Sequence, residues 1–228
     1  MTAVSEPVRL LVVDDDPLVR AGLSSMLSGA PELELVGDAA DGQEAVDAVR
    51  ELQPDVVLMD IGMPVLDGVA ATEAIRRRSA APDVVMLTTF GSDADLLRAL
   101  RAGASGYLLK DAAPAEIVAA VLKVAAGESV LSPQATRQLM DHVGTVDEDS
   151  RRTTALAALA LLTERERDVV LAVAEGMSNA EVATALDVGI ATVKTHLTNS
   201  LAKLQLTNRV QLALLAHVAG MTDQSGGV

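Results

Sequence analysis

The chain has 228 residues and a net charge of −14, and it contains no cysteine, one Phe and one Tyr. This length suffices for two domains with aliphatic cores, and the missing cysteines exclude disulfide frameworks and thiolate metal sites. Because the first residues lack the basic stretch of a signal peptide, and the longest apolar run (155–162) is too short to span a bilayer, we expect a soluble, cytoplasmic protein without a membrane partner.

The first 126 residues alternate short aliphatic runs with longer segments of helical period. We expect strands at 8–13, 32–37, 55–59, 83–88 and 105–110. We expect helices at 17–29, 41–52, 67–78, 92–103 and 113–127. Five strands that alternate with five helices predict an α/β fold with a parallel sheet covered on both faces. A flavodoxin-like (βα)5 domain with strand order 2-1-3-4-5 fits this length.

Residues 127–160 change in character. We expect a helix near 133–142, with Pro133 at its first position, and then an irregular linker over the polar residues 144–154. The apolar run 155–162 should pack against the segments that come after it in the chain. Charge divides the chain in the same region, because the residues from 151 onward carry seven basic and seven acidic side chains. We therefore predict domains at 1–126 and 161–228, joined by a linker at 127–160.

The last part of the chain is helical in pattern throughout. Two Ser/Thr-x-x-Glu capping boxes, "TERE" at 163–166 and "SNAE" at 178–181, each open a segment with helical period. A short turn at 187–189 then leads into a longer helix at 190–204, and a fourth helix should run from Thr207 to about His217. Two capped helices, a turn and a longer helix predict an all-α, four-helix domain with a helix-turn-helix.

Polar side chains stand at the carboxyl ends of four predicted strands, where ligands bind in doubly wound sheets. In chain order they are Asp14, Asp15 and Asp16, then Asp60, Thr88 and Lys110. Crowded carboxylates repel one another unless a cation joins them, and oxygen ligands without His or Cys favour Mg²⁺. Thr88 and Lys110 suit the oxygens of a phosphoryl group, and Asp60 suits a carboxylate nucleophile that accepts one.

The motifs "VVDDDP", "LMDIGMPVLDG", "LTT" and "GYLLKD" resemble the receiver domain of two-component response regulators over residues 8–126. The resemblance implies that a sensor histidine kinase phosphorylates Asp60. It also implies a magnesium site made by Asp14, Asp15, Asp60 and the backbone carbonyl of Gly62. Thr88 and Lys110 would contact the phosphoryl group, and Tyr107 would be a switch that packs inward when Thr88 moves. Asp16 and Asp67 are interpreted as turn or cap residues.

The helix at 190–204 has two distinct faces. Residues at three- and four-residue steps predict a buried face made of Ile190, Val193, Leu197, Leu201 and Leu204. The opposite face is small and polar, with Lys194 and Lys203 at its flanks, and such a face fits the major groove of DNA. Zero net charge in this part of the chain predicts weak nonspecific binding and an affinity that depends on dimerisation.

Residues 162–213 resemble the LuxR-type helix-turn-helix, and the whole chain is similar to NarL/FixJ-type response regulators. That resemblance implies a homodimer on a double-stranded DNA operator. Lys194, Thr195 and Thr198 would approach bases, while Thr192, Lys203 and Arg209 would contact phosphates. Three residues depart from the usual pattern: Gly189 in place of a serine cap, Ile190 in place of a polar residue, and Gln205 in place of a glycine. At Ile190 this departure favours an exposed hydrophobic residue over a contact with a thymine methyl group. If Gln205 is left-handed, it costs about 1–2 kcal/mol.

The chain is thus expected to be a transcription factor and not an enzyme, with phosphorylation of Asp60 altering interdomain contacts or dimerisation. Three other interpretations stay open. An Mg²⁺ phosphatase with an Asp nucleophile would need a second acid beside Asp60, and Gly62 stands at that place. A DNA-binding regulator that acts without phosphorylation and a pure interaction adaptor are the other two.

Overall fold

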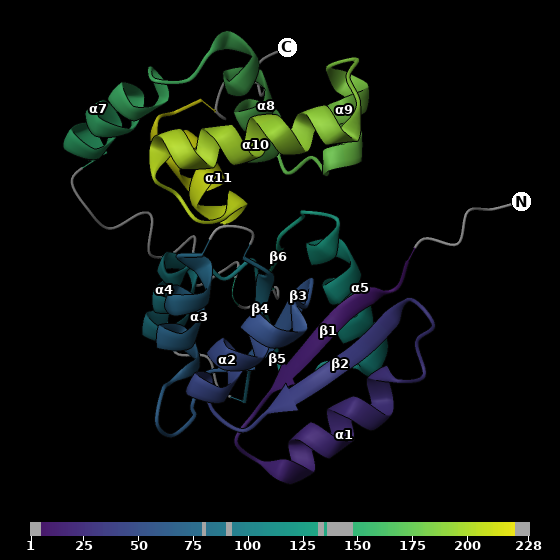
Figure 1. Cartoon of the computed structure of the whole chain (residues 1–228). Helices are drawn as coiled ribbons and strands as arrows, with labels where there is room; N and C mark the ends of the chain where they lie inside the picture. Colours follow the sequence, from purple (N-terminus) through teal and green to yellow (C-terminus); the bar gives the residue numbers. More distant parts are fainter. Residues whose placement is uncertain (1–5, 79–80, 90–92, 132–134, 136–147, 222–228) are drawn as a thin grey trace, which may run out of the picture. The chain divides into compact units, whose positions relative to one another are not determined.

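The computed structural model describes residues 6–78, 81–89, 93–131, 135 and 148–221 (Figure 1). The chain forms two compact units, Met1–Leu139 and Met140–Val228. Apart from Ala135, the helix predicted near 133–142 lies outside the described residues.

The first unit is built on a six-stranded parallel sheet. Its strands are β1 (Val8–Val13), β2 (Leu33–Ala39), β3 (Val56–Asp60), β4 (Asp83–Thr88), β5 (Gly106–Leu109) and β6 (Val130–Leu131). Their order is β2-β1-β3-β4-β5-β6, which confirms the predicted order 2-1-3-4-5 and adds an edge strand. The sequence did not reveal β6, because a strand of two residues has no period to detect.

Five helices cover the two faces of this sheet. They are α1 (Pro17–Leu27), α2 (Gly42–Leu52), α3 (Gly68–Arg76), α4 (Asp93–Ala102) and α5 (Pro114–Ala125). Helices α1 and α5 contact each other on one face, and α2, α3 and α4 pack in series on the other (Figure 1). Residues 10–13 of β1 are buried on both sides of the strand, as expected for a parallel sheet between two helical layers.

Aspartates and a glycine position the loops at the carboxyl edge of the sheet. Asp16 and Asp67 are the N-caps of α1 and α3, as predicted, and accept from the backbone N–H groups of Leu18 and Ala70. A Cβ atom on Gly68 would overlap the carbonyl oxygen of Asp60. Glycine therefore lets α3 begin directly behind the end of β3.

The second unit consists of helices in its described residues. They are α7 (Glu148–Leu159), α8 (Glu164–Ala174), α9 (Asn179–Ala185), α10 (Ile190–Leu204) and α11 (Arg209–Val218). Both predicted capping boxes are present, at Thr163–Glu166 and Ser178–Glu181. Helix α10 packs on α8 and α9, and α11 packs on α8 and α7. In neither unit is a described helix long and apolar enough to cross a membrane.

The prediction of an irregular linker over 144–154 was wrong from Glu148 onward, because α7 begins there. The side chains of Ala155 and Leu159, in the second half of α7, are buried in the core of the second unit. The predicted packing of the run 155–162 is thereby confirmed. The polar first half is a continuation of this packed helix, and a helical turn made of polar residues shows no apolar period in the sequence.

Helix α10 follows the predicted faces except at its first residue. Val193 and Leu197 are buried, but the Ile190 side chain is 49% exposed. The burial of Ile190 that the three- and four-residue steps predicted was therefore wrong, and the exposed position that its departure from the family pattern favoured is confirmed. Side chains on a helix lean toward its N-terminus, which carries Ile190 past the turns that pack on the neighbouring helices. At the other end of α10, Gln205 is left-handed, with φ 55° and ψ 36°.

Candidate functional site

Three carboxylates gather at the carboxyl edge of the sheet in the first unit. Asp14 follows β1, Asp60 ends the neighbouring strand β3, and Asp15 stands beside them. One oxygen from each of the three lies within 4.8 Å of the other two. Asp14 and Asp60 are 1% and 7% exposed, whereas Asp15 is exposed. The predicted meeting of these acids across the topological switch is confirmed.

The ammonium group of Lys110 joins the two buried carboxylates. Its Nζ lies 2.5 Å from Oδ2 of Asp14 and 3.0 Å from Oδ1 of Asp60. The backbone N–H of Lys110 donates to the carbonyl oxygen of Thr88 at 2.7 Å, which ties the residue after β5 to the end of β4. Four strand ends therefore meet at one point, as the sequence predicted.

The electrostatics of the site reflect this burial. Desolvation raises the pKa of Asp60 above its ordinary value, against the opposing hydrogen bond and charge of Lys110, and the charge of Asp14 adds to the rise. Burial alone would lower the pKa of Lys110, but its contacts with Asp14 and Asp60 outweigh that effect and raise it. Lys110 is thus held as a cation between two acids.

These residues fit a hard divalent cation. The three acids offer oxygen ligands, which Mg²⁺ prefers, and neither His nor Cys belongs to the cluster. Among the residues that the structure describes, no donor makes a hydrogen bond to the buried Oδ2 of Asp14, although the ammonium group of Lys110 lies close to it. Gly62 is exposed, and a Cβ there would meet nothing within 4 Å, so its backbone borders open space.

Thr88 and Tyr107 lie on the neighbouring strands β4 and β5. Thr88 ends β4 and is 5% exposed, and Tyr107 on β5 is 1% exposed. The Tyr107 hydroxyl has no hydrogen-bond partner in the described part of the chain. Burial, with a smaller contribution from Asp95, raises the pKa of Tyr107 to about 12. Tyr107 is therefore packed inward in this structure.

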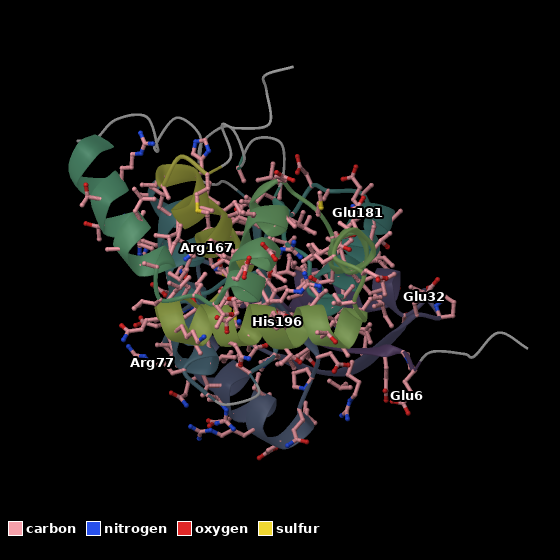
Figure 2. The ribbon with its side chains drawn as sticks, turned by 90° about the horizontal axis from the view of Figure 1, so that it is seen from above. Glu6, Glu32, Arg77, Arg167, Glu181 and His196 are labelled. Carbon is pink, nitrogen blue, oxygen red and sulfur yellow. The ribbon has the colours of Figure 1, made fainter. Side chains whose placement is uncertain are left out.

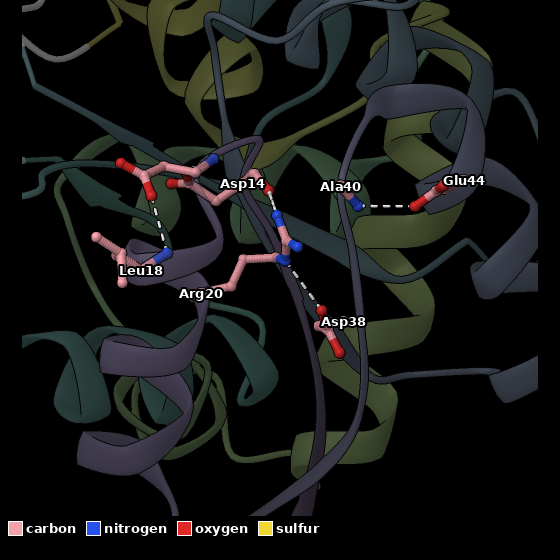
Figure 3. A network of polar contacts seen from close by, with 7 residues as sticks. Asp14, Leu18, Arg20, Asp38, Ala40 and Glu44 are labelled. Carbon is pink, nitrogen blue, oxygen red and sulfur yellow. Dashed lines mark hydrogen bonds and ion pairs between the residues drawn. The ribbon is translucent and has the colours of Figure 1, made fainter.

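Arg20 on α1 is a residue of the site that sequence reasoning missed. Its Nη1 donates to the backbone carbonyl oxygen of Asp14 at 2.6 Å, and its Nε lies 3.0 Å from Oδ2 of Asp38 at the end of β2 (Figure 3). The sequence held no signal for this contact, because one Arg on an amphipathic helix looks like an ordinary surface residue.

Helix α10 presents the side chains that the sequence assigned to DNA. His196 marks this helix in Figure 2. The predicted contact residues Thr192, Lys194, Thr195 and Thr198 are all exposed. The hydroxyls of Thr195 and Thr198 donate to the carbonyl oxygens of Ala191 and Lys194 in their own helix. The exposed face carries small and polar side chains, as predicted.

Two of the predicted phosphate contacts also serve the fold. Nζ of Lys203 lies 2.8 and 2.6 Å from the two carboxylate oxygens of Glu166 on α8. Hydrogen bonds from Lys203 and from the backbone N–H of Thr163 lower the pKa of Glu166 to about 2. Arg209 donates to the carbonyl oxygen of Met177 at 2.6 Å. Both cations therefore connect helices within the second unit.

A doubly wound domain with acids, a Thr and a Lys at its strand ends, followed in the same chain by a helix-turn-helix unit, defines a class of regulator with a receiver and a DNA-binding domain. Comparison with known proteins agrees. Residues 10–122 match the response regulator receiver domain family, and residues 160–216 match the luxR family of bacterial regulatory proteins. The chain belongs to the response regulators that carry a LuxR-type DNA-binding domain.

Individual relatives cover nearly the whole chain. Response regulator protein VraR of Staphylococcus aureus is 39% identical over 209 residues, 92% of this chain and 96% of VraR. The crystal structure of the response regulator ChrA, from a heme-sensing two-component system, is 34% identical with a TM-score of 0.52, over 93% of this chain and 98% of ChrA. A LuxR-family response regulator from Aurantimonas sp. SI85-9A1 is 36% identical with a TM-score of 0.57, over 60% of this chain and 98% of that one.

Proposed function

We propose that Asp60 accepts a phosphoryl group from a sensor histidine kinase, and that this modification controls binding of the chain to a DNA operator. The observation that carries the proposal is the ammonium group of Lys110, which lies between the buried carboxylates of Asp14 and Asp60. A cation held at the mouth of the sheet beside a buried carboxylate suits a site where a dianionic group arrives.

In the proposed transfer, an oxygen of Asp60 attacks the phosphorus of the kinase phosphohistidine and forms an oxygen–phosphorus bond. The phosphorus–nitrogen bond breaks, and its electron pair leaves with the imidazole of the kinase histidine. Lys110 and Thr88 contact the oxygens of the transferred group. Asp14, Asp15 and the backbone carbonyl of Gly62 hold Mg²⁺ together with Asp60. The bound ion supplies positive charge that offsets the charge of the phosphoryl oxygens. Tyr107 reports the new position of Thr88 to the outer face of the receiver.

The proposed output is a change in interdomain contacts or in dimerisation of a cytoplasmic protein. The receiver would span 1–126 and the DNA-binding domain 161–228. The segment 127–160 that joins them contributes β6 to the sheet of the first unit and α7 to the core of the second. Lys194, Thr195 and Thr198 would approach bases, and Thr192, Lys203 and Arg209 would contact phosphates. The ion pair of Lys203 with Glu166 orients its ammonium group and leaves the side chain 40% exposed, so phosphate contact is compatible with it.

We infer that the chain catalyses no reaction on another molecule. A phosphatase with an Asp nucleophile needs a second acid that activates water at the acyl phosphate. Gly62, two residues after Asp60, stands at the position where such an acid would be needed; it is exposed and has no side chain.

The first test is intact mass after incubation with Mg²⁺ and a small acyl phosphate. We expect a gain of one phosphoryl group, and no gain in the Asp60→Ala variant or without Mg²⁺. Asp16→Ala is a matched control, because Asp16 caps α1 and is not assigned to the ion. No gain in folded wild-type protein would favour a regulator that acts without phosphorylation.

A further inference from the structure

We infer that Arg20 is a positioning residue for the cation site: it fixes the backbone of Asp14 so that this carboxylate meets the ion in one orientation. The inference rests on the proposed function, because it assigns Asp14 to the cation. It adds a residue of α1 that belongs to neither the acids nor the phosphoryl contacts.

Asp14 is held at four of its atoms. Its backbone N–H donates to the carbonyl oxygen of Ala39 on β2 at 3.2 Å, and its carbonyl oxygen accepts from Arg20 at 2.6 Å. Its Oδ1 accepts the backbone N–H of Asp16 at 3.0 Å, and its Oδ2 faces Lys110. By contrast, the exposed Asp15 has no hydrogen bond or ion pair with the residues that the structure describes. Asp14 is the rigid acid and Asp15 the adaptable one.

Arg20 itself is fixed in place. Its guanidinium bridges the ends of two strands, Asp14 after β1 and Asp38 in β2 (Figure 3), and its side chain is only 17% exposed. The planar fork lets one side chain hold a carbonyl and a carboxylate at once, which an ammonium group does less well. Because Asp38 neutralises its charge, Arg20 acts on the site through geometry.

Groups that hold a metal ligand in place typically change metal affinity 10- to 100-fold when removed. Arg20 touches a ligand and not the ion, so the same range applies. A purely electrostatic role predicts the opposite sign, since loss of a cation near three carboxylates strengthens binding of a divalent ion. The direction of the change therefore distinguishes positioning from charge.

The experiment is a titration of the full-length chain with Mn²⁺, in which electron paramagnetic resonance measures the free and the bound ion. A second titration adds Mg²⁺ as a competitor for the same site. We expect Arg20→Ala to weaken binding about tenfold, and Arg20→Lys to recover part of the loss because one of the two bonds can form. Arg50→Ala is the matched control, since Arg50 also pairs with an Asp, at 3.2 Å, but on the exposed surface of α2. Its affinity should equal that of the wild type.

The outcomes separate this inference from the proposed function. Wild-type protein that binds no Mn²⁺ would overturn both. If the wild type binds Mn²⁺ and Arg20→Ala binds it equally or more tightly, only the positioning role is overturned. The same holds if Arg50→Ala loses as much Mn²⁺ affinity as Arg20→Ala. If far-UV circular dichroism shows that Arg20→Ala does not fold, Arg20→Lys decides: an affinity equal to that of the wild type overturns the inference.

Discussion

Tyr107 is the one tyrosine of a chain without tryptophan, so its ionisation can be followed alone. Because burial raises its pKa to about 12 from 10.0, the folded protein favours the neutral phenol. The stability that this preference contributes is present below pH 10 and is lost as the pH rises toward 12. We expect tyrosinate absorbance of the folded chain to have its midpoint near 12, and near 10 in concentrated urea. A folded-state midpoint near 10 would contradict the inward position.

Glu166 takes part in a helix cap and in an ion pair, so its contribution to the stability of the second unit depends on pH. The lowered pKa, about 2 against 4.5, means that its carboxylate stabilises the second unit above pH 4.5, and this stability is lost as the pH falls toward 2. We expect Glu166→Gln to lower protection of α8 and α10 by about 1–2 kcal/mol at neutral pH. Hydrogen exchange of the full chain, read by mass spectrometry, measures this.

The matched control for Glu166 is Glu181, which completes the same kind of capping box on α9. Glu181 is exposed and, within the described parts of the chain, forms no ion pair. Glu181→Gln should reduce protection less than Glu166→Gln. The difference in hydrogen-exchange protection between Glu166→Gln and the wild type should also become smaller below pH 4.5. A constant difference across pH would show that packing, and not the ion pair with Lys203, is what the substitution removes.

At the scale of elements, the end of α10 carries strain that a single substitution can relieve. Gln205 is left-handed, and a side chain in that conformation costs about 1 kcal/mol relative to glycine. We expect Gln205→Gly to raise the unfolding temperature of the second unit, measured by calorimetry.

The reverse change is Gly176→Ala, after α8, where φ is +85° and no atom lies within 4 Å of the added Cβ. It should lower the unfolding temperature through backbone conformation alone.

At the scale of the whole molecule, charge limits how the chain can bind DNA. The residues from 151 onward are neutral overall, and Lys203 and Arg209 make contacts inside their own unit. We therefore expect nonspecific attraction to DNA to be weak, and the affinity for DNA to depend on two copies of the chain binding together. We expect acyl phosphate to tighten operator binding in fluorescence anisotropy, more at low than at high salt. Asp60→Ala should not respond.

Removal of the receiver tests how phosphorylation would change operator binding. A fragment that begins at Met140, where the second unit starts, should bind the operator without phosphorylation if the receiver inhibits it. A fragment that binds no better than the unphosphorylated chain would instead point to dimerisation through the receiver. Sedimentation of the phosphorylated full-length chain supplies the independent measure of its oligomeric state.

Local pattern was sufficient for most of the fold. The apolar runs predicted β1, β3 and β4 to within one residue, and the capping boxes predicted where α8 and α9 begin, because these signals lie in a few adjacent residues. The same logic predicted that Asp14, Asp60 and Lys110 would meet, since parallel strands end at one edge. Pattern failed at the start of α7 and at β6, because a polar helical turn and a two-residue strand have no apolar period.

By itself, the sequence determined the two kinds of domain, the order of the strands and the identity of the acids, since each follows from periodicity, caps and strand ends. Only the tertiary structure decided which side chains pair across long separations. Arg20 reaches Asp14 and Asp38, and Lys203 reaches Glu166. These outcomes depend on how helices pack against their neighbours, and a cation on a helix surface has the same sequence pattern whether it faces solvent or a buried carboxylate.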